Sequence, residues 1–387
     1  MTHSVQMRAP RALVIGGGVS GLTTALLLRR GGFNVTVVAE KLAPGVTSVI
    51  AGALWEWPPA VCGSHQNLVS LQRSKSWCAS SYAIFSNLAE NPDTGVFMRL
   101  ANFYFKRAIE PNSRDAQKMN ETRRNVRQFL HDPALIQANQ INPDANLQDA
   151  YRYLAPMIDT HAYMEWLLKE AKHAGCVVTL GKITGALRER ERELKQQYGV
   201  DLIVNCAGLG ARELTGDPMW PLRGGLVVLR NDEGSMPRLT EAHCLSHDGI
   251  SSEPYFVFIL PRGRNLLLVG GMAEPNEWNL DVNLQNYPPF RTMFERCLDF
   301  LPALRNMRIA SGEPERVGLR PVRKENVRLE LEPGTSIIHN YGHGGSGVTF
   351  SWGCAQEVVQ MGEALVSGSV NNANAEAETR MSASIAG

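Results

Sequence analysis

The sequence predicts an α/β protein in which a parallel sheet is joined to a second, mostly antiparallel β-sheet. Residues 11–40 show a strand, turn, helix, strand pattern, and a further apolar strand over 200–208 ends in small residues. Between 223 and 313, short β-rich segments alternate with turns such as 261–265. Strands that alternate with helices favour a parallel sheet, whereas strands separated by turns favour an antiparallel one.

The composition excludes several classes of protein. The chain has 387 residues, 44% of them hydrophobic, which is enough to bury the cores of two domains. Its 39 Lys and Arg nearly balance its 38 Asp and Glu, and no basic stripe favours nucleic acid as a partner. The seven cysteines form neither a CxxC pair nor a Cys/His cluster, which predicts buried thiols in a reducing compartment and no metal site.

The two ends of the chain indicate a cytoplasmic protein that does not enter a membrane. Residues 1–11 carry charge and lead into a glycine-rich turn instead of a cleavable apolar stretch. No segment of the chain reaches about 18 uncharged apolar residues. Residues 371–387 are rich in Ala, Asn, Glu and Ser, with almost nothing to bury, which favours a disordered tail.

A glycine-rich turn joins the first strand to the first helix. Gly16, Gly18 and Gly21 have the spacing GxGxxG, which lets the backbone turn sharply, approach a pyrophosphate and direct helix amides at it. Glu40 follows the second strand, where its carboxylate can accept both hydroxyls of an adenosine ribose and repels a 2′-phosphate. These features predict a Rossmann-like dinucleotide-binding domain; a purely structural glycine turn is the alternative.

The remaining segments divide the chain into two interleaved domains. A helix capped by Asp159 or Thr160 and a strand after Gly175 continue the α/β pattern, whereas 66–149 is polar and weakly periodic. The charge run at 188–195 is typical of a solvated helix face. We predict a nucleotide-binding domain made of 8–60, 155–222 and 312–370, and a substrate or cap domain made of 61–154 and 223–311.

A second glycine loop, 343–349, opens a helix near the C-terminus. Such a helix start would place backbone donors and the positive end of a dipole beside a flavin ring, and would stabilise negative charge on the ring during reduction. The loop therefore favours FAD over NAD as the dinucleotide. The alternative is that these glycines only let a strand turn into a helix.

Five separated stretches resemble the D-amino-acid oxidase family, in the family's order. They are 14–21, 47–55, 205–208, 318–323 and 339–354, and the last of them, HNYGHGGSGVTFSWGC, is highly specific. The resemblance covers nearly the whole chain and is weakest over 66–154. It implies a Rossmann-like FAD-binding domain with a second domain on a mostly antiparallel β-sheet.

The resemblance also implies where FAD is bound, and that the binding is non-covalent, because nothing here resembles the tethering cysteine of sarcosine oxidases. The first glycine turn would hold the pyrophosphate, Glu40 the ribose, 47–54 the neighbourhood of the flavin, and 344–349 the pyrimidine edge of its ring. The cofactor-binding residues would be Gly16, Gly18, Val19, Ser20, Glu40, Lys41, Thr47, Ser48, Gly52, Ala53, Leu54, Ile183, Ala207, Gly208, Gly344, Gly345, Ser346, Gly347, Val348 and Thr349.

By the same resemblance, Arg320 in the motif GLRPVR would clamp the substrate carboxylate. A planar guanidinium can hold a carboxylate by two parallel charge-assisted bonds, which fix orientation as well as charge. The alternative is that Arg320 pairs with an internal acid such as Glu313 or Glu315, although Arg323 is the more suitable structural partner. Tyr255 would place a hydroxyl on the same carboxylate, or else pack as a core side chain.

The family's mechanism implies hydride transfer from the substrate α-carbon to flavin N5, with the amine entering neutral. No side-chain base is then needed, and holding the two atoms about 3 to 3.5 Å apart can contribute about 7 to 11 kcal/mol. The carbonyl near Gly345 would accept a hydrogen bond from the amine. The product imine would hydrolyse to a keto acid and ammonia, and molecular oxygen would take the electrons and form peroxide.

Two positions depart from the family pattern. Ser251 or a neighbour stands where vertebrate-type enzymes carry a second, lid-forming tyrosine, and Glu56 replaces a neutral residue beside the flavin. An ionised Glu56 facing the pocket would repel an anionic side chain by about 1 to 4 kcal/mol at roughly 4 Å, so we hypothesise a preference against D-Asp and D-Glu. The alternative is that Glu56 points to solvent or pairs with a nearby Arg.

Two other functions stay open at this point. A glycine, sarcosine or other secondary-amine oxidase of a biosynthetic pathway would use Arg320 equally well. A non-enzymatic FAD-binding protein with a vestigial pocket is the second, and the retained Arg320 and Tyr255 argue against it. The number of chains in the assembly also stays open, a homodimer included, and so does the natural electron acceptor.

Overall fold

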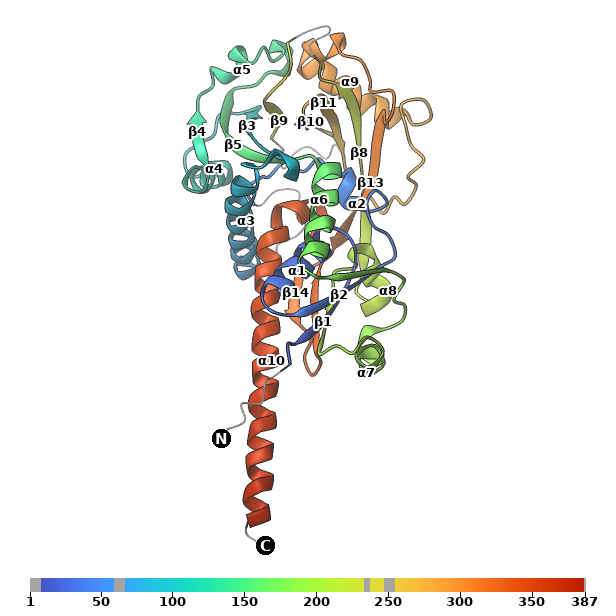
Figure 1. The fold of residues 1–387 in the computed structure, drawn as a ribbon. Coiled ribbons are helices and arrows are strands. Elements are labelled where there is room, and N and C mark those ends of the chain that lie inside the picture. The colour runs from blue at the N-terminus through green and yellow to red at the C-terminus, as the bar shows by residue number, and fades with distance from the viewer. Residues whose placement is uncertain (1–7, 59–66, 233–236, 247–254, 386–387) are drawn as a thin grey trace.

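A computed structural model describes residues 8–58, 67–232, 237–246 and 255–385; for Tyr255 and 369–385 it describes the backbone alone. These residues form a six-stranded and a nine-stranded sheet, with helices packed against both (Figure 1). The arrangement confirms the predicted α/β fold, in which a parallel sheet is joined to a second, mostly antiparallel one.

The first sheet is parallel apart from one edge strand. Its members are β1 (Arg11–Ile15), β2 (Asn34–Ala39), β6 (Val177–Leu180), β7 (Leu202–Asn205), β14 (Arg328–Leu331) and β15 (Ile337–Tyr341). They lie in the order β14-β15-β7-β1-β2-β6, and β14 runs antiparallel to β15. In the centre, Val14 of β1 pairs with Val37 on one side and Val204 on the other. A central strand covered on both faces is expected to be apolar, as β1 is from Ala12 to Ile15.

Helices cover both faces of this sheet (Figure 1). One face packs against α1 (Val19–Arg30), α6 (Thr160–His173) and α10 (Gly347–Ile385), and the other against α7 (Leu187–Tyr198) and α8 (Ala211–Thr215). Alternate residues of β1 point to opposite faces: Ala12 and Val14 pack on the α1 side, and Leu13 and Ile15 on the α7 side. The chain therefore builds the three layers of a nucleotide-binding fold around β1.

Two of these helices match the sequence in detail. The first residue before α6 is Asp159, its N-cap, and the helix buries Tyr163, Met164 and Leu167 on one face. The charge run predicted to be a solvated helix face lies on α7, which buries little beyond Leu187 and Leu194.

The second sheet is antiparallel apart from one pair. Its members are β3 (Val96–Phe105), β4 (Arg127–His131), β5 (Asp149–Ile158), β8 (Met219–Arg230), β9 (Ala242–Leu245), β10 (Tyr255–Arg262), β11 (Leu266–Met272), β12 (Glu274–Pro275) and β13 (Glu315–Arg323). The order is β12-β8-β11-β10-β9-β3-β5-β4, with β13 paired to β8 and the parallel pair between β3 and β9. We refer to the edge of this sheet formed by β4 as the β4 end, and to the opposite edge, where β8 pairs with β12 and β13, as the β8/β13 end.

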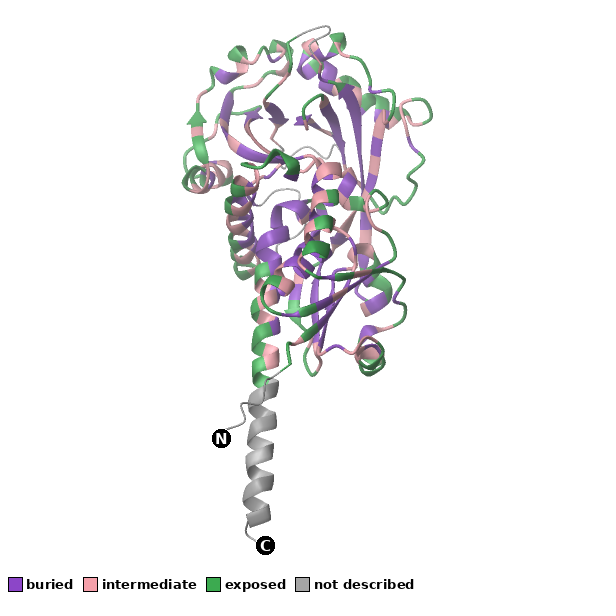
Figure 2. Ribbon diagram, viewed as in Figure 1, coloured by how far each residue is buried: buried purple, intermediate pink, exposed green. Residues whose placement is uncertain are grey.

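The remaining helices link the two sheets or cover the second one. They are α2 (Thr47–Ile50), α3 (Leu68–Leu88), α4 (Arg114–Asn125), α5 (Leu135–Ala138) and α9 (Pro288–Phe300). α9 covers β10 and β11, and α3 packs along α10, where Trp77 donates to Glu357 at 2.5 Å. Buried residues concentrate in the strands and where α10 meets α3 (Figure 2).

The two sheets do not divide the chain where the sequence predicts. The expected divisions at 154/155 and 222/223 fall inside β5 and β8. β13, expected in the nucleotide-binding domain, pairs with β8 in the second sheet along its whole length. A long strand that passes from one part of the protein to the other leaves no break in the local sequence pattern, so composition does not locate these boundaries.

The C-terminus also differs from the prediction. α10 is continuous from Gly347 to Ile385, so the backbone of 371–385 is helical where the sequence favours a disordered tail. Ala and Glu are strong helix formers, and residues added to an existing helix need no new nucleus. Among the described residues, none of the helices combines the length and apolar character that crossing a membrane would require.

We expect Gly353→Ala to lower the free energy of unfolding by about 1 to 3 kcal/mol. A Cβ on Gly353 would lie 2.5 Å from the carbonyl oxygen of Trp77, in the backbone of α3, which cannot move aside without disturbing the α3–α10 contact. The control is Gly368→Ala in the same helix, which has no neighbour within 4 Å and should gain about 0.5 to 1 kcal/mol from helix propensity. Denaturant unfolding monitored by circular dichroism measures both; equal stability of the two variants would contradict the close contact.

Candidate functional site

The carboxyl ends of β1, β2, β7 and β15 meet at a cavity of about 530 Å³, whose wall also includes residues of β8, β10 and β13. Ligands of parallel α/β sheets bind at this end of the strands. All twenty residues that the sequence assigns to the cofactor line the cavity, from Gly16 to Thr349 along the chain. Arg320 and Glu56 line it as well.

The first glycine turn has the backbone shape that phosphate binding requires. Gly16 has a φ of 121°, which L side chains rarely adopt. A Cβ on Gly21 would lie 2.9 Å from the carbonyl carbon of Gly16, so glycine is needed there for α1 to pack on the turn. The backbone amides of Gly18 and Ser20 donate to no acceptor in the described part of the chain. They lie at the N-terminus of α1, which is the positive end of the helix dipole. These donors fit a pyrophosphate.

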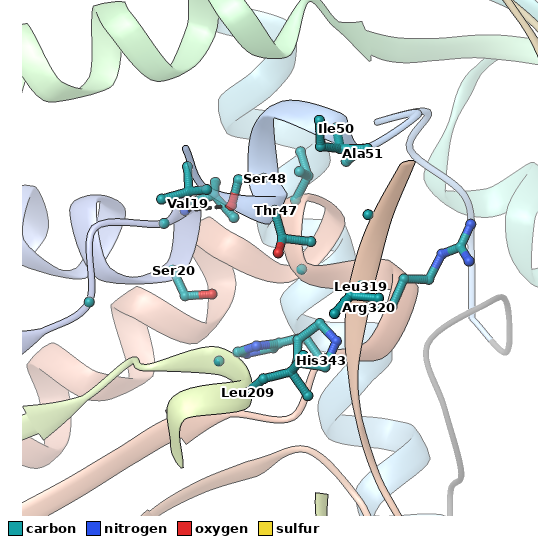
Figure 3. A pocket seen from close by; sticks show the side chains of 18 of the residues that line it. Val19, Ser20, Thr47, Ser48, Ile50, Ala51, Leu209, Leu319, Arg320 and His343 are labelled. Carbon is teal, nitrogen blue, oxygen red and sulfur yellow. Dashed lines mark hydrogen bonds between the residues drawn. The ribbon is translucent and has the colours of Figure 1, made fainter. Parts of the chain in front are cut away.

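The segment that follows β2 returns to the same turn. The amide of Val19 donates to Ser48 Oγ at 2.9 Å, which ties α2 to the start of α1. Figure 3 shows Thr47 and Ser48 beside Val19, with Arg320 on the other side of the cavity. Glu40 directly follows β2 and is exposed along the cavity, where its carboxylate can reach a ribose.

The second glycine loop forms a short 3-10 turn, Gly344–Ser346, that leads directly into α10. Beside it lies His343, whose Nε2 contacts Asn340 Oδ1 at 3.0 Å. Burial lowers the pKa of His343 to about 4, so the ring is neutral at neutral pH. The positive potential at this end of the cavity therefore comes from the start of α10 rather than from the imidazole.

Arg320 is a cation of the cavity wall that has no carboxylate partner among the described residues. Its Nη1 donates to the carbonyl of Met272 at 2.9 Å, and no described acceptor lies within hydrogen-bonding distance of Nε or Nη2. Burial lowers the pKa of Arg320 to about 10, which leaves the group charged at neutral pH. A desolvated cation without a counterion favours an anionic ligand.

The internal acids that could have paired with Arg320 have other partners. Glu313 pairs with Arg316 at 2.7 Å, and Glu315 accepts from the amide of Leu284. Arg323 forms a structural ion pair, as predicted, but its partner is Asp217 at 2.6 Å rather than Glu313 or Glu315.

The guanidinium of Arg320 packs against the backbone of β8 at Gly224. A Cβ on Gly224 would lie 2.5 Å from Cζ of Arg320, so the guanidinium lies directly on the backbone of β8. Next to it, a Cβ on Gly225 would meet Met272 Sδ at 2.8 Å. Glycine in a strand interior often marks such a close approach. This role of Gly224 was not predicted from the sequence, although two adjacent glycines in a predicted strand indicate a close approach of this kind.

Arg316 presents unpaired donors in the cavity wall. The side chain is 2% exposed, and its Nη2 donates to Glu313 and contacts His161 Nδ1 at 3.0 Å. Its Nε and Nη1 have no acceptor among the described residues. A buried donor left without an acceptor costs about 1 to 3 kcal/mol, and these two atoms are shielded from solvent, so Arg316 lines the cavity with its charge paired and two donors unsatisfied.

Arg262 holds the segment that follows α2 against the second sheet. Its Nη2 donates to the carbonyls of Ala51 at 2.6 Å and Gly52 at 3.0 Å, and its Nη1 donates to Thr160 Oγ1 at 3.1 Å. Burial, with the nearby charge of Arg316, lowers the pKa of Arg262 to about 9. Arg262 therefore positions residues that line the cavity without lining it itself.

The part of the cavity under β10 is apolar. Phe256, Phe258 and Leu260 alternate along the strand and line the cavity, whereas Val257 and Ile259 pack in the core against α9. This wall can enclose an aliphatic or aromatic group and exclude water.

The side chain of one predicted substrate residue, and the position that lacks the lid tyrosine, lie outside the described part of the structure. Tyr255 begins β10 and its backbone pairs with Met272, but its side chain lies outside what the structure describes. Ser251 also lies outside the described residues. The predicted contact of Tyr255 with a substrate carboxylate stays a prediction.

Glu56 lines the cavity, but it is not a free charge. Lys118 Nζ of α4 lies 2.5 Å from Glu56 Oε1, and both side chains are largely buried. The sequence left open a carboxylate facing the pocket or one paired with a nearby Arg; the structure combines the two, with Lys in place of Arg. Lys118 lies 62 residues away in sequence, and no local pattern indicated the pairing.

The cysteines match the prediction of buried thiols. The six described ones are free and buried. Cys206 lines the cavity, and burial raises its pKa to about 12, which keeps the thiol protonated. Among the described side chains, no three His, Cys, Asp or Glu residues cluster as a metal site would require.

Comparisons with known proteins identify the family of the chain. Residues 11–361 match the family model described as DAO, FAD dependent oxidoreductase. A D-amino-acid oxidase of Rubrobacter xylanophilus is 35% identical over 361 residues, which is 92% of this chain and 97% of the relative. A D-amino-acid oxidase of Streptomyces coelicolor is 31% identical over 366 residues, with 92% and 97% of the two chains covered.

Solved structures share the fold. The glycine oxidase of Bacillus cereus superposes with a TM-score of 0.67 at 18% identity, over 92% of this chain and 95% of that one. The L-proline dehydrogenase of P. horikoshii superposes with a TM-score of 0.69 at 14% identity, over 92% and 93%. Together with the two glycine turns and the cavity between the sheets, the family match over residues 11–361 shows that the chain belongs to the DAO family of FAD-dependent oxidoreductases.

Proposed function

We propose that this protein oxidises the C–N bond of a D-amino acid with non-covalently bound FAD. The imino acid product hydrolyses to a keto acid and ammonia, and oxygen is reduced to hydrogen peroxide. The observation that carries the proposal is the guanidinium of Arg320, charged, desolvated and without a carboxylate partner in the described part of the cavity. The names of the 35% and 31% identical relatives support the choice of D-amino acids.

The cavity offers complementary groups for each part of FAD. The free amides of Gly18 and Ser20 would hold the pyrophosphate, and Glu40 the ribose. The loop 344–349 would supply positive potential along the edge of the flavin ring. Because the thiol of Cys206 stays protonated, the cavity lacks a nucleophilic sulfur at that position, which supports non-covalent binding.

The chain's own residues orient the substrate. FAD, held by the residues above, would supply a two-electron acceptor for the α-hydrogen of the substrate, with oxygen as the final oxidant. Nε and Nη2 form one edge of the Arg320 guanidinium, and both can donate to one carboxylate in a bidentate pair. The carbonyl near Gly345 would accept from a neutral amine, and the apolar face of β10 would enclose the side chain. Catalysis then comes mainly from orientation, which can contribute about 7 to 11 kcal/mol.

A panel of D-amino acids, L-amino acids, glycine and N-methyl amino acids in a peroxide assay tests the proposal. We expect peroxide with D-amino acids at a higher kcat/KM than with any other class. A preference for glycine or N-methyl amino acids would instead establish the secondary-amine oxidase. A flavin that stays oxidised with every candidate would support the non-enzymatic, FAD-binding alternative.

We expect Arg320→Lys to reduce kcat/KM for D-alanine by about tenfold to a hundredfold, because hydrogen bonds to charged groups contribute about 1.5 to 3 kcal/mol. The lysine keeps the charge but loses the planar edge that fixes the carboxylate. Arg320→Met should reduce kcat/KM further, because this variant also removes the positive charge. Steady-state peroxide formation gives the rates, and flavin absorbance confirms that cofactor is retained. Arg320→Met with kcat/KM within twofold of the parent protein would refute the clamp.

We expect Gly224→Ala to raise KM for D-alanine by about tenfold or more while FAD stays bound. The added methyl group would lie 2.5 Å from Cζ of Arg320 and would displace the guanidinium, which weakens a bond worth about 1.5 to 3 kcal/mol. Gly312→Ala is the control, because nothing lies within 4 Å of a Cβ there. Benzoate titration of the flavin spectrum measures carboxylate binding directly; unchanged benzoate affinity in Gly224→Ala would show that Gly224 does not position Arg320.

A further inference from the structure

An ion pair forms part of the cavity wall at the β4 end of the second sheet. Glu56 lines the cavity, and Lys118 holds one of its carboxylate oxygens, Oε1, at 2.5 Å from behind. Lys118 itself is not among the cavity-lining residues. The second oxygen, Oε2, has no partner among the described residues. The pair therefore presents a polar group with no net charge to the cavity.

The pair is well shielded from solvent. The side chains of Lys118 and Glu56 are 18% and 17% exposed. Burial alone would lower the pKa of Lys118, but the adjacent charge of Glu56 outweighs it and raises the pKa. Lys118 therefore remains charged at neutral pH. Ion pairs at this depth are screened by salt far less than surface pairs.

The pair and Arg320 belong to opposite ends of the second sheet. Lys118 lies on α4, next to β4 and β5, whereas Arg320 lies on β13, paired with β8 (Figure 1). Glu56 reaches the cavity from the β5 side, since the amide of Trp55 donates to the carbonyl of Pro156 in that strand. Because Arg320 and Glu56 line the same cavity from these two sides, a ligand held by its carboxylate on Arg320 could extend its other end toward Glu56.

We propose that Glu56 and Lys118 form a specificity-determining pair that selects amino acids with neutral side chains. The inference rests on the proposed function, because Arg320 must hold the carboxylate for the side chain to face the pair. A neutral wall gives neither an anionic nor a cationic side chain a counterion to compensate for its desolvation. An amide or hydroxyl on the substrate can still donate to Oε2.

The proposal makes an asymmetric prediction for the two halves of the pair. Glu56→Gln leaves the charge of Lys118 unbalanced behind the wall, which attracts an anionic group. Lys118→Met leaves Glu56 unbalanced at the wall, which attracts a cationic group. The double variant restores a neutral wall. If the pair only held α4 in place, each single variant would instead lower the affinity for all ligands by a similar factor.

Binding of three carboxylates to the FAD-loaded protein tests this without turnover. Succinamate, succinate and 4-aminobutyrate carry a neutral, an anionic and a cationic end, and each is titrated by the change in flavin absorbance. The unaltered protein should bind succinamate best. Glu56→Gln should increase the affinity for succinate relative to that for succinamate by on the order of tenfold. Lys118→Met should increase the relative affinity for 4-aminobutyrate by a similar factor. The double variant should return to the original ranking.

A neighbouring ion pair supplies the control. Lys75 and Glu121 lie 2.8 Å apart with similar burial, and neither lines the cavity. Lys75→Met and Glu121→Gln should leave the three-ligand ranking unchanged. If Glu56→Gln and Lys118→Met also leave it unchanged, the inference is wrong. If the ranking shifts as expected but no D-amino acid yields peroxide, the proposed function fails while the pair keeps its role.

Discussion

The cavity depends on one unbalanced charge, the guanidinium of Arg320. Removing a charged group from water costs several kcal/mol unless a partner compensates for it. Arg316 and Arg323 each have a carboxylate partner, whereas Arg320 donates to the carbonyl of Met272. Part of the desolvation cost is therefore not recovered in the free protein, and a bound carboxylate would recover it. The folded protein therefore has affinity for an anion before a ligand binds. Few other charged groups are then needed to bind a carboxylate.

Backbone geometry, rather than further side chains, makes room for that charge. Gly224 of β8 and Gly318 of β13 pair directly across the two strands. The Arg320 guanidinium lies over Gly224, and a Cβ on Gly318 would meet the side chain of Ile50 at 2.9 Å. The glycine pair therefore lets the guanidinium of Arg320 and the C-terminal end of α2 pack against the same two strands. Any larger residue at either position would separate them.

The sequence predicts those parts of the site whose chemistry is local. The GxGxxG turn, Glu40 after β2 and the loop before α10 depend on neighbours within a few residues, and all of them line one cavity. Contacts that join distant segments are different. Met272 lies 48 residues from Arg320, and Lys118 lies 62 residues from Glu56, so neither contact has a local pattern. The same reason explains the misplaced domain boundaries, because β8 and β13 pair across a long insertion.

The charges of the cavity also bear on the state of the substrate. At the substrate side, Arg320 contributes one uncompensated positive charge, while Glu56 with Lys118 and Arg316 with Glu313 are each balanced. A carboxylate ligand brings that region to neutrality. An ammonium group would then add a positive charge with no counterion in a desolvated site, which favours loss of its proton. The arrangement thus favours the neutral amine, whose lone pair is needed for C–H cleavage, without any dedicated base. The absence of a catalytic base from the proposed mechanism is then a consequence of charge balance and needs no separate explanation.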